Sequence, residues 1–584
     1  MENQVVIQDK QGSRWLRFRD PEEVISVNSI DGVMPALEKI DQIVNARGLY
    51  AAGFICYEAS PAFDSALTTH APSTAPLMWF GLYHQPEEIV IPVQAPSYEL
   101  GDWLPSVNET DYGKAIERIK TLIAEGRTYQ VNYTIRLRSK FQGDPWGIFL
   151  DMIRAQESRY AAYVELGPLS ICSTSPELFF ELNGNELISR PMKGTAERGR
   201  TLAEDRDRSD WLHNSEKNRA ENVMIVDMIR NDVGRVSQIG SVHVPRLFSV
   251  ERYPTVWQMT STVRSQTKAS IPEILSALFP CASITGAPKV STMEIIADLE
   301  STPRGVYTGC IGYIAPGRYS QFNVAIRTVV VNKSKGEAEY GVGGGIVWDS
   351  TAKEEYQECQ TKTRVLTERR PEFELLESLL WTPEEDFFLL EEHLHRLSES
   401  GEYFGFELDI DRIRAALDNH ISSSPRQAKK IRLTISRRGV IAVEGIPISC
   451  HEPARIGLSI NPINRDDVFL YHKTTHRDMY DKAMHERPDC DDVLLWNEEG
   501  EITESTTANM VVGFNGCLFT PPVESGLLPG TFRRTLLEEG VIEERAITLA
   551  DLEKRDSLFL INSVRKWRRA SLIKEYAGQQ LSQP

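Results

Sequence analysis

The sequence predicts two modules of mixed α+β architecture that join near residue 370. Its 584 residues suggest three or four domain-sized units. In both modules, short strand patterns are interspersed with helical patterns, which is typical of packed sheets with helices outside. A charged stretch at 367–374, TERRPEFE, separates the end of a helical pattern from a new apolar pattern. We therefore expect a first module of residues 1–370, with 1–110 as its N-terminal part, and a second of residues 371–584.

The individual elements follow from apolar periodicity and turn residues. In the first module we expect strands at 161–164, 169–172, 178–182, 309–315, 324–331 and 341–348, and helices at 112–125, 215–230, 292–299 and 354–366. In the second module we expect helices at 389–403 and 410–422, and strands at 430–436, 493–496 and 510–514.

Composition excludes several classes of protein. The formal charge is −18 and there is no basic run, which disfavours a nucleic-acid binder. The eight cysteines are too sparse for a disulfide scaffold and form no CxxC pair. The N-terminus lacks a signal-peptide core, and no apolar stretch is long enough to cross a bilayer. We expect a cytoplasmic protein that binds neither membrane nor nucleic acid.

Two predicted helices carry carboxylates on a defined face. Glu221 lies on the same face as Met224, Ile225 and Met228, so it should be paired, hydrogen-bonded or metal-bound. An ion pair with Lys217 is the alternative.

Glu355, Glu358 and Lys362 share one face of the next such helix. Two carboxylates one turn apart suit Mg²⁺. A solvated face with a Glu358–Lys362 pair is the alternative.

Lys193 lies in SRPMKGTAERG, where Pro191 and Gly194 predict a turn after a strand. A lysine at such a turn is either an activated amine nucleophile or simply exposed.

Seven segments of the first module, in order between about residues 111 and 370, resemble the chorismate-utilising enzymes, specifically their aminodeoxychorismate synthase component I branch. They are EGRTYQVNYT, STSPELFFE, RPMKGTAERG, KNRAENVMIVDMIRNDVGRV, SITGAPKVSTMEIIADLE, FNVAIRT and GVGGGIVWDSTAKEEYQECQTK. The resemblance implies stacked antiparallel sheets with peripheral helices around one cleft that takes chorismate. It implies Mg²⁺ on Glu221 and Glu358 with Glu355 nearby, and Glu177 as general acid. The implied substrate-binding residues are Arg327, Tyr307, Thr195 and the backbone of Gly343 and Gly345.

Lys193 distinguishes the branches of this family. By this resemblance, the position of Lys193 carries lysine in the aminodeoxychorismate enzymes. The anthranilate and isochorismate branches usually carry alanine at that position. The implied role is attack on C2 of chorismate with loss of the C4 hydroxyl, followed by addition of ammonia at C4. Two departures are Gln258, where many relatives have histidine, and Cys281-Ala282, where many have Gly-Gly. The chain lacks a GxCxG glutaminase motif, so we expect a separate glutamine amidotransferase subunit to supply ammonia.

The second module resembles the class IV (fold-type IV) pyridoxal-phosphate enzymes through five looser segments. They are LEEHLHRLSES, FLYHKTTHRDMYDKA, EGEITESTTANMVV, GLLPGTFRR and FLINSVRKW. The resemblance implies that Lys473 bonds covalently to pyridoxal 5'-phosphate and that Glu504 pairs with its pyridinium nitrogen. It also implies that Arg396 holds the phosphate, with backbone amides near Thr507 and Thr531. Class IV relatives often dimerise, so a homodimer through this module is expected.

Two departures favour a lyase over a transaminase in the second module. Asp478 stands where a tyrosine is expected five residues after Lys473, and Phe532 replaces a phosphate-binding threonine. Lyases of this group also tend to carry K-x-x-x-R, here Lys473 to Arg477. The expected function is 4-aminobenzoate synthesis for folate, with the second module eliminating pyruvate from the product of the first. The alternatives are an anthranilate-type synthase, a fusion to a D-amino-acid or branched-chain aminotransferase, and a non-catalytic scaffold.

Overall fold

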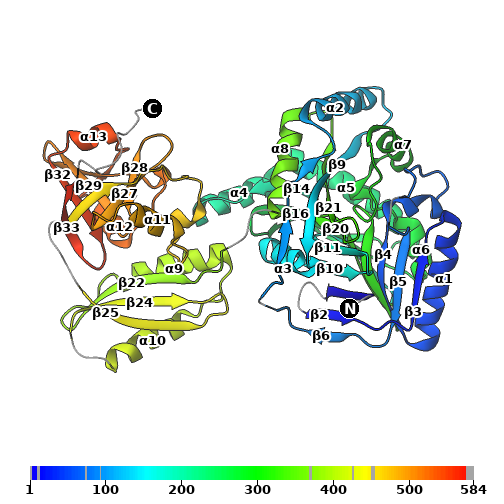
Figure 1. Ribbon diagram of the computed structural model, residues 1–584, viewed down its shortest axis with the longest axis horizontal. Coiled ribbons are helices and arrows are strands. Elements are labelled where there is room, and N and C mark those ends of the chain that lie inside the picture. The colour runs from blue at the N-terminus through cyan, green and yellow to red at the C-terminus, as the bar shows by residue number, and fades with distance from the viewer. Residues whose placement is uncertain are drawn as a thin grey trace. The chain divides into compact units, whose positions relative to one another are not determined.

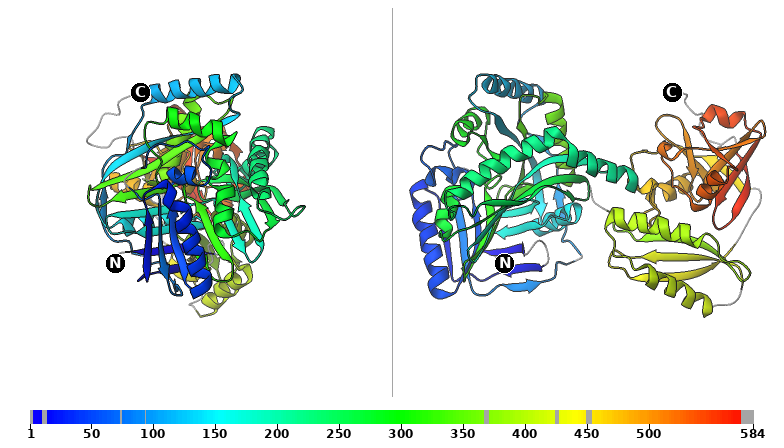
Figure 2. Two further views of the ribbon diagram at one scale, coloured as in Figure 1. Left: turned by 90° about the vertical axis from the view of Figure 1, so that its right-hand side faces the viewer. Right: turned by 180° about the vertical axis from the view of Figure 1, so that it is seen from behind.

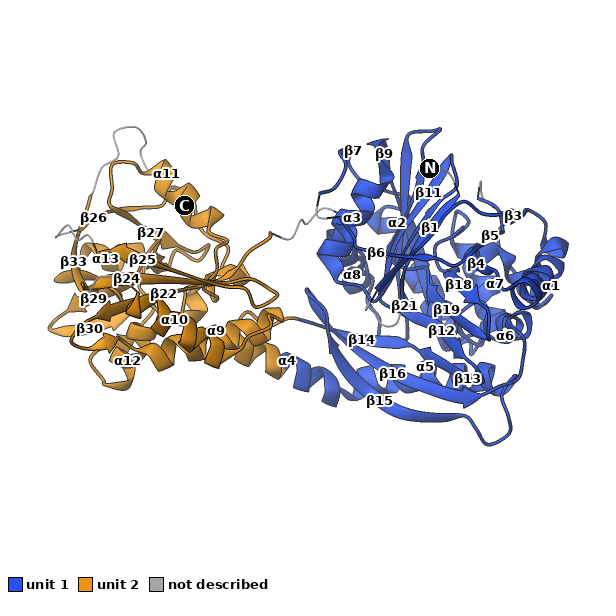
Figure 3. Cartoon of the chain, turned by 90° about the horizontal axis from the view of Figure 1, so that it is seen from below, with its two compact units in different colours: residues 1–197, 208–370 blue, residues 198–207, 371–584 orange. Residues whose placement is uncertain are grey.

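The computed structural model in Figure 1 describes residues 3–9, 14–72, 75–92, 94–366, 371–423, 427–448 and 454–573. The chain forms two compact units, coloured separately in Figure 3. The first contains Met1–Glu197 and Arg208–Arg370, and the second contains Arg198–Asp207 and Pro371–Pro584. The predicted charged stretch begins at 367–370, which lies outside the described residues.

The first unit contains two antiparallel sheets. One follows the order β17-β9-β21-β20-β11-β10-β1-β2-β6, with β7 and β8 also paired to β9. Its strands are β1 (Gln4–Asp9), β2 (Arg14–Phe18), β6 (Glu87–Ile89), β7 (Tyr98–Leu100), β8 (Leu104–Pro105), β9 (Gln130–Gly143), β10 (Tyr160–Glu165), β11 (Leu169–Ser175), β17 (Gly286–Ala287), β20 (Thr328–Asn332) and β21 (Glu337–Ile346).

The other sheet follows the order β14-β16-β13-β12-β19-β18-β4-β5-β3, with β15 also paired to β16. Its strands are β3 (Glu23–Val27), β4 (Tyr50–Ile55), β5 (Met78–Tyr83), β12 (Leu178–Asn183), β13 (Glu186–Arg190), β14 (Met192–Glu197), β15 (His243–Arg252), β16 (Val256–Gln266), β18 (Cys310–Ala315) and β19 (Tyr319–Val324).

Helices accompany these sheets, and the first six residues of α4 (Leu202–Asn214) belong to the second unit. They are α1 (Ile30–Arg47), α2 (Glu109–Ala124), α3 (Pro145–Gln156), α4 (Leu202–Asn214), α5 (Glu216–Gly234), α6 (Ile271–Leu278), α7 (Lys289–Leu299) and α8 (Ala352–Thr363), with short 3₁₀ turns at Tyr57–Ala62, Ala282–Ile284 and Arg364–Leu366. Figures 1 and 2 show α1 along the outside of β3, β4 and β5. Polar caps begin several helices; Ser215 accepts from the backbone of Asn218 at the start of α5. The two sheets bury an apolar layer between them that includes Val5, Phe54 and Ile171.

The structure contains every predicted element but divides one of them. The stretch 324–331 is not a single strand, because β19 ends at Val324 in one sheet and β20 begins at Thr328 in the other. A strand cannot pair within two stacked sheets at once, so the chain turns between them. Arg327 makes that turn with a φ of 50°.

The second unit contains two further sheets. The four-stranded sheet has the order β23-β22-β24-β25 and the eight-stranded one β28-β27-β26-β33-β32-β29-β30-β31. Their strands are β22 (Leu375–Thr382), β23 (Asp386–Phe387), β24 (Lys429–Ile435), β25 (Ile441–Pro447), β26 (Ala454–Leu458), β27 (Asp492–Trp496), β28 (Ile502–Ser505), β29 (Asn509–Phe514), β30 (Cys517–Thr520), β31 (Glu543–Glu544), β32 (Ser557–Asn562) and β33 (Lys566–Leu572). The helices are α9 (Leu390–Phe404), α10 (Ile410–Ser422), α11 (Asp478–Glu486), α12 (Thr531–Glu538) and α13 (Leu549–Glu553), with 3₁₀ turns at Val468–Leu470 and Val523–Ser525.

Alternation along β22 and β24 gives the four-stranded sheet two different faces. Leu379 and Leu433 point with their apolar neighbours toward Leu394 of α9 and Leu417 of α10. Residues at the intervening positions lie on the opposite face, because successive side chains alternate. In the part of the chain that is described, no helix has both the length and the apolar content needed to cross a bilayer.

Candidate active sites

Lys193 lies within a strand, which corrects the predicted turn. It belongs to β14, but the register with β16 shifts between Met192 and Thr195, and Gly194 at that shift has a φ of 103°. The shift is a β-bulge, a device that redirects a side chain. Lys193 is largely buried, and its Nζ lies 3.9 Å from Glu221 Oε2. The alternative considered for Glu221 was an ion pair with Lys217, whereas the cation that the structure brings to it is Lys193.

Three glycines of β21 let polar groups approach its backbone closely. A Cβ added to Gly345 would lie 2.4 Å from Lys193 Nζ and 2.2 Å from Gln130 Nε2. A Cβ added to Gly344 would lie 2.7 Å from Glu355 Oε2. A larger side chain at these positions would therefore displace the Lys193 and Gln130 side-chain ends from the strand. The Gly343 carbonyl accepts a 2.8 Å hydrogen bond from Lys362.

The three predicted metal-binding carboxylates lie around this same stretch. Burial raises the pKa of Glu355, whose carboxylate accepts a 2.7 Å bond from Ser350. Lys362 lowers the pKa of Glu358 from 2.6 Å away, so the predicted Glu358–Lys362 pair is present. The described residues contain no group of three or more His, Cys, Asp or Glu side chains arranged to hold a metal. Because Mg²⁺ takes one or two protein carboxylates and keeps its waters, a magnesium site on Glu221 and Glu358, with Glu355 nearby, stays a prediction.

Glu177 is almost completely buried, at 3 % exposed, in the loop between β11 and β12. Burial raises the pKa of its carboxyl to about 7. A carboxyl group with this pKa is partly protonated at neutral pH, as a general acid requires. The position and its electrostatics thus agree with the predicted role.

Gln130 is a candidate site residue that the sequence reasoning missed. It is fully buried at the start of β9, and neither amide atom has a hydrogen-bond partner among the described residues. Its position against Gly345 and Lys193 places a free donor and a free acceptor beside the candidate nucleophile. Its only signal in the sequence was its presence within EGRTYQVNYT.

The predicted substrate-binding residues have other partners in the structure. Arg327 donates to Gln156 at 2.8 Å, and burial lowers its pKa. Tyr307 is buried with the Arg136 guanidinium 5.2 Å from its ring centroid. Thr195 is exposed and hydrogen-bonds Gln258. Their contacts with a substrate stay predictions.

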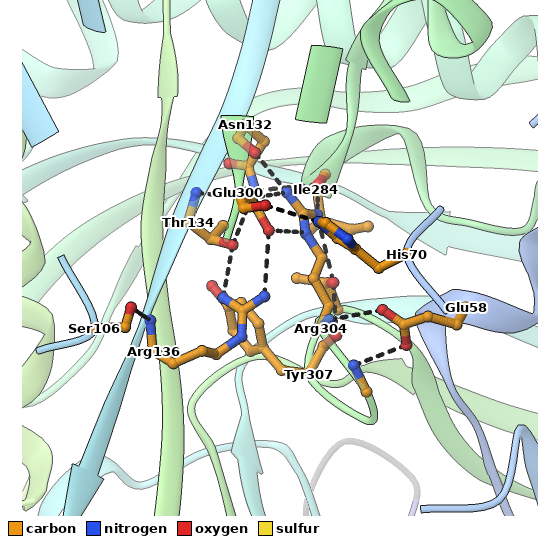
Figure 4. A network of polar contacts seen from close by, with 12 residues as sticks. Glu58, His70, Ser106, Asn132, Thr134, Arg136, Ile284, Glu300, Arg304 and Tyr307 are labelled. Atoms are coloured by element: carbon orange, nitrogen blue, oxygen red, sulfur yellow. Dashed lines mark hydrogen bonds and ion pairs between the residues drawn. The ribbon is translucent and has the colours of Figure 1, made fainter. Parts of the chain in front are cut away.

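A buried ionic network lies beneath Tyr307, as Figure 4 shows. Glu300 accepts bonds from Arg304 at 2.7 Å and from Arg136 at 3.2 Å, and all three side chains are at most 2 % exposed. Arg304 also donates to the carbonyl of Ile284 at 2.9 Å. Because an unpaired buried charge is costly, this network fixes the segments that it joins.

In the second unit, Lys473 lies against the end of β22. Its carbonyl accepts from the Leu376 backbone at 3.0 Å. Burial, together with the nearby Arg396 and Arg477 guanidinium groups, lowers the pKa of its amine to about 7. A large fraction of this amine is neutral at pH 7, as a nucleophile or base must be.

Glu504 is buried on β28. Burial raises the pKa of its carboxyl to about 7. It accepts a 2.9 Å hydrogen bond from Tyr480 and a 3.2 Å bond from Asn509. Tyr480 was not predicted as a site residue, because the motif expected tyrosine two positions earlier.

Arg396 on α9 is held by Glu377 on β22. Its Nε and Nη2 donate to the two oxygens of Glu377 at 2.9 and 2.7 Å. His393 bonds Glu377 at 2.6 Å and Thr531 at 3.3 Å, so it connects this pair to the first residue of α12. Glu377 was missed because it precedes the recognised motif, and His393 was missed although it lies inside that motif.

Thr507 was predicted beside the phosphate, and its hydroxyl donates to Asp492 at 2.5 Å.

Four cations, Lys430, Arg432, Arg477 and Arg565, lie near one another, and Arg477 is also close to Lys473. Lys430 and Arg432 lie on the face of β24 opposite to the helices, paired with Leu380 and Ser378 of β22. Burial lowers the pKa of Lys430. The nearby positive charges of Arg565, Arg432 and Arg477 lower it further, whereas Glu444 raises it. A half-buried set of like charges favours an anionic ligand. The sequence reasoning identified only Arg477.

Comparison with known proteins assigns the two parts of the chain to two enzyme classes. Residues 91–368 match the model of the chorismate binding enzymes, and residues 374–573 match that of the class IV amino-transferases. The chain therefore joins a chorismate-binding enzyme domain to a class IV aminotransferase domain, as the sequence analysis predicted.

The curated relatives concern the first domain. The chain is 39 % identical over 273 residues to aminodeoxychorismate synthase component 1 of Salmonella typhimurium, covering 46 % of this chain and 60 % of the relative. It is 41 % identical over 264 residues to the same component of Bacillus subtilis, covering 45 % and 56 %. A chloroplastic aminodeoxychorismate synthase of Arabidopsis thaliana is 40 % identical over 284 residues, covering 48 % and 31 %. The chain thus spans about one third to three fifths of these relatives.

A solved structure has the same fold as the first unit. Anthranilate synthase component I from Streptococcus pneumoniae aligns with a TM-score of 0.54 at 23 % identity, over 62 % of this chain and 93 % of that one.

The class IV domain implies pyridoxal phosphate. The residues present fit this group: a buried amine with a lowered pKa, a buried carboxyl at Glu504, and Arg396 near the N-terminus of α12. A cation beside a helix N-terminus suits a phosphate.

Proposed function

We propose that the chain makes 4-aminobenzoate from chorismate in two consecutive reactions. The first domain adds ammonia to chorismate to give 4-amino-4-deoxychorismate, and the second domain eliminates pyruvate from that product. The observation that carries this proposal is Lys193 at the bulge of β14, directed to Gly345 and Glu221. An amine at this position distinguishes para amination from the ortho amination of anthranilate enzymes, by the resemblance described above.

In the first reaction Lys193 forms a bond from Nζ to C2 of the chorismate ring. The C4–O bond breaks, and Glu177 gives its proton to the leaving hydroxyl, so that water departs. Ammonia then bonds to C4, and the Lys193–C2 bond breaks to return the amine. The unpaired amide of Gln130 lies where it can hydrogen-bond the substrate or ammonia. Mg²⁺ on Glu221 and Glu358, with Glu355 nearby, would supply positive charge for the substrate carboxylate.

In the second reaction the side chains of the class IV domain bind substrate and move one proton. Pyridoxal phosphate, when bound, supplies an electron sink. Lys473 takes the proton from C4 of the substrate, and pyruvate leaves from C3 so that the ring becomes aromatic. The substrate 4-amino-4-deoxychorismate has two carboxylates. Such a substrate suits the group of cations formed by Lys430, Arg432, Arg477 and Arg565. This charge match supports the lyase over a transaminase for apolar amino acids.

Ammonia would come from a separate glutamine amidotransferase. The curated bacterial relatives are named as component 1, which supports a second component.

Product analysis tests the proposal. The purified protein is incubated with chorismate, Mg²⁺, ammonium and pyridoxal phosphate, and the products are separated and identified by mass. We expect 4-aminobenzoate and pyruvate in equal amounts. Anthranilate as the product would contradict the proposal for the first domain, and 4-amino-4-deoxychorismate that accumulates without pyruvate would contradict it for the second.

A further inference from the structure

The Glu177 carboxyl is the end of a chain of hydrogen-bonding side chains. Ser283 Oγ lies 2.7 Å from Glu177 Oε1, and Cys281 Sγ lies 3.2 Å from Ser283 Oγ. All three residues are buried, with at most 9 % of any of them exposed. Cys281 and Ser283 lie more than a hundred positions after Glu177 in the sequence, so only the fold brings the three residues together.

The direction of these bonds follows from chemistry. An ionised carboxylate can only accept, so the Ser283 hydroxyl donates to Glu177. The Ser283 oxygen keeps lone pairs and can accept from the Cys281 thiol, a weak donor. The Cys281 thiol therefore donates to the Ser283 hydroxyl, and the Ser283 hydroxyl donates to the Glu177 carboxylate. Each donor strengthens the next because the bonds polarise one another.

The turn that carries Ser283 is fixed on the side away from Glu177. It is the 3₁₀ turn Ala282–Ile284. The Ile284 carbonyl accepts from Asn132 at 3.1 Å and from Arg304 at 2.9 Å, within the network of Figure 4. The Thr285 hydroxyl also bonds the carbonyl of Cys281. With its backbone held in this way, the Ser283 hydroxyl stays aimed at the carboxyl.

We propose that Ser283, supported by Cys281, orients the Glu177 carboxyl and sets the pH range over which it gives its proton to the leaving hydroxyl. This inference rests on the general-acid role in the proposed function.

The charged and titratable groups around Glu177 determine the pKa of its carboxyl. Lys193 on β14 and the Met192 backbone N–H favour the ionised form, as does Ser283, whereas burial opposes it and raises the pKa to about 7. Cys281 lies close enough for Glu177 to help raise the thiol pKa. Tyr253 is adjacent and donates to the Pro176 carbonyl. Since only the protonated carboxyl can give a proton, activity falls as pH rises through this pKa.

The test is the pH profile of chorismate amination with free ammonia held constant at each pH. Ser283→Ala removes a donor to the ionised form, so we expect the basic limb to move upward by about one pH unit. Cys281→Ala should move it in the same direction by less, and Cys281→Ser, which keeps a donor, should leave it at or below its original position. The matched control is Cys310→Ala, a buried thiol without a bond to Ser283, which should not move the limb.

An unmoved basic limb in Ser283→Ala overturns the inference. If that variant does not fold, the pair Cys281→Ala and Cys281→Ser decides, and identical profiles for the two overturn it. A second readout needs no turnover: the carboxyl C=O infrared band that disappears in Glu177→Gln is titrated in each variant. The same shifts are expected there even if the product analysis contradicts the proposed function, so the two failures are distinguishable.

Discussion

The two candidate reacting lysines lie in different electrostatic surroundings. Lys193 meets carboxylates, with Glu221 3.9 Å away and Glu355 of α8 close to the neighbouring Gly344 of β21. Lys473 has two cations, Arg396 and Arg477, as well as the carboxylates of Glu377 and Glu504 nearby, and burial together with the cations lowers the pKa of its amine to about 7. The structure thus surrounds the two lysines with different sets of charged groups. Acidic groups around the first suit a metal-bridged substrate, and cations around the second suit a phosphate and carboxylates.

The largest expected effect is from Lys473→Ala. Removing the amine that holds the cofactor and moves the C4 proton should lower 4-aminobenzoate release by more than about a thousandfold. The 4-amino-4-deoxychorismate made by the first domain should accumulate, as measured by chromatography with mass detection. The control is Lys482→Ala, an exposed lysine on α11, which should keep full activity. Undiminished release by Lys473→Ala would remove this lysine from the mechanism.

Lys193→Ala should stop the first reaction to a similar degree while leaving chorismate binding largely intact. The reason is that covalent attack is lost whereas the carboxylates and glycines around the site remain. Turnover of chorismate and calorimetric binding of chorismate with Mg²⁺ measure the two properties separately. Lys140→Ala, at an exposed position on β9, is the control. Normal turnover in Lys193→Ala would refute the nucleophile role and with it the contrast between the two lysines.

A smaller effect is expected from Lys430→Gln in the cationic group of the second domain. Loss of one charge-assisted contact with a substrate carboxylate should raise KM for 4-amino-4-deoxychorismate about tenfold or more, with a smaller change in kcat. Steady-state kinetics with the purified intermediate provide the measurement. A KM equal to that of the unmodified protein would show that these cations do not contact the substrate.

The last prediction is of a different kind and concerns stability at acidic pH. Burial raises the pKa of Glu377, but Arg396 and His393 outweigh it and lower the value to about 2. A lowered carboxyl pKa stabilises the fold above its unfolded value of 4.5, and this stability is lost as pH falls toward 2. The loss should be on the order of 3 kcal/mol for the second domain. Urea unfolding followed between pH 5 and 2 should show this loss in the unmodified protein and a flatter curve in Glu377→Gln; parallel curves would contradict it.

The sequence predicted the elements well where apolar periodicity was strong. The strands at 169–172 and 178–182 and the helix at 215–230 are present as β11, β12 and α5. It failed where one apolar run serves two sheets, as at 324–331, because periodicity does not record a change of sheet at Arg327. It also misread Lys193, because Pro191 and Gly194 indicate a turn as readily as a bulged strand.

The site was predicted only where residues lie inside recognised motifs. Glu177, Lys193 and Lys473 were proposed in this way, and their catalytic roles stay predictions. Gln130 was missed although its motif was recognised, because its isolation from partners is visible only in three dimensions. Ser283 likewise acquires meaning only through its 2.7 Å bond to a carboxyl far away in the sequence.

The most direct test of two reactions in series is an assay of an equimolar mixture of the Lys193→Ala and Lys473→Ala proteins. Each protein retains one intact site, so the intermediate made by one can be consumed by the other. The account predicts that neither protein alone releases 4-aminobenzoate from chorismate and ammonium, whereas the mixture does. A mixture that releases none, while the unmodified protein does, would contradict the assignment of the two steps to these two sites.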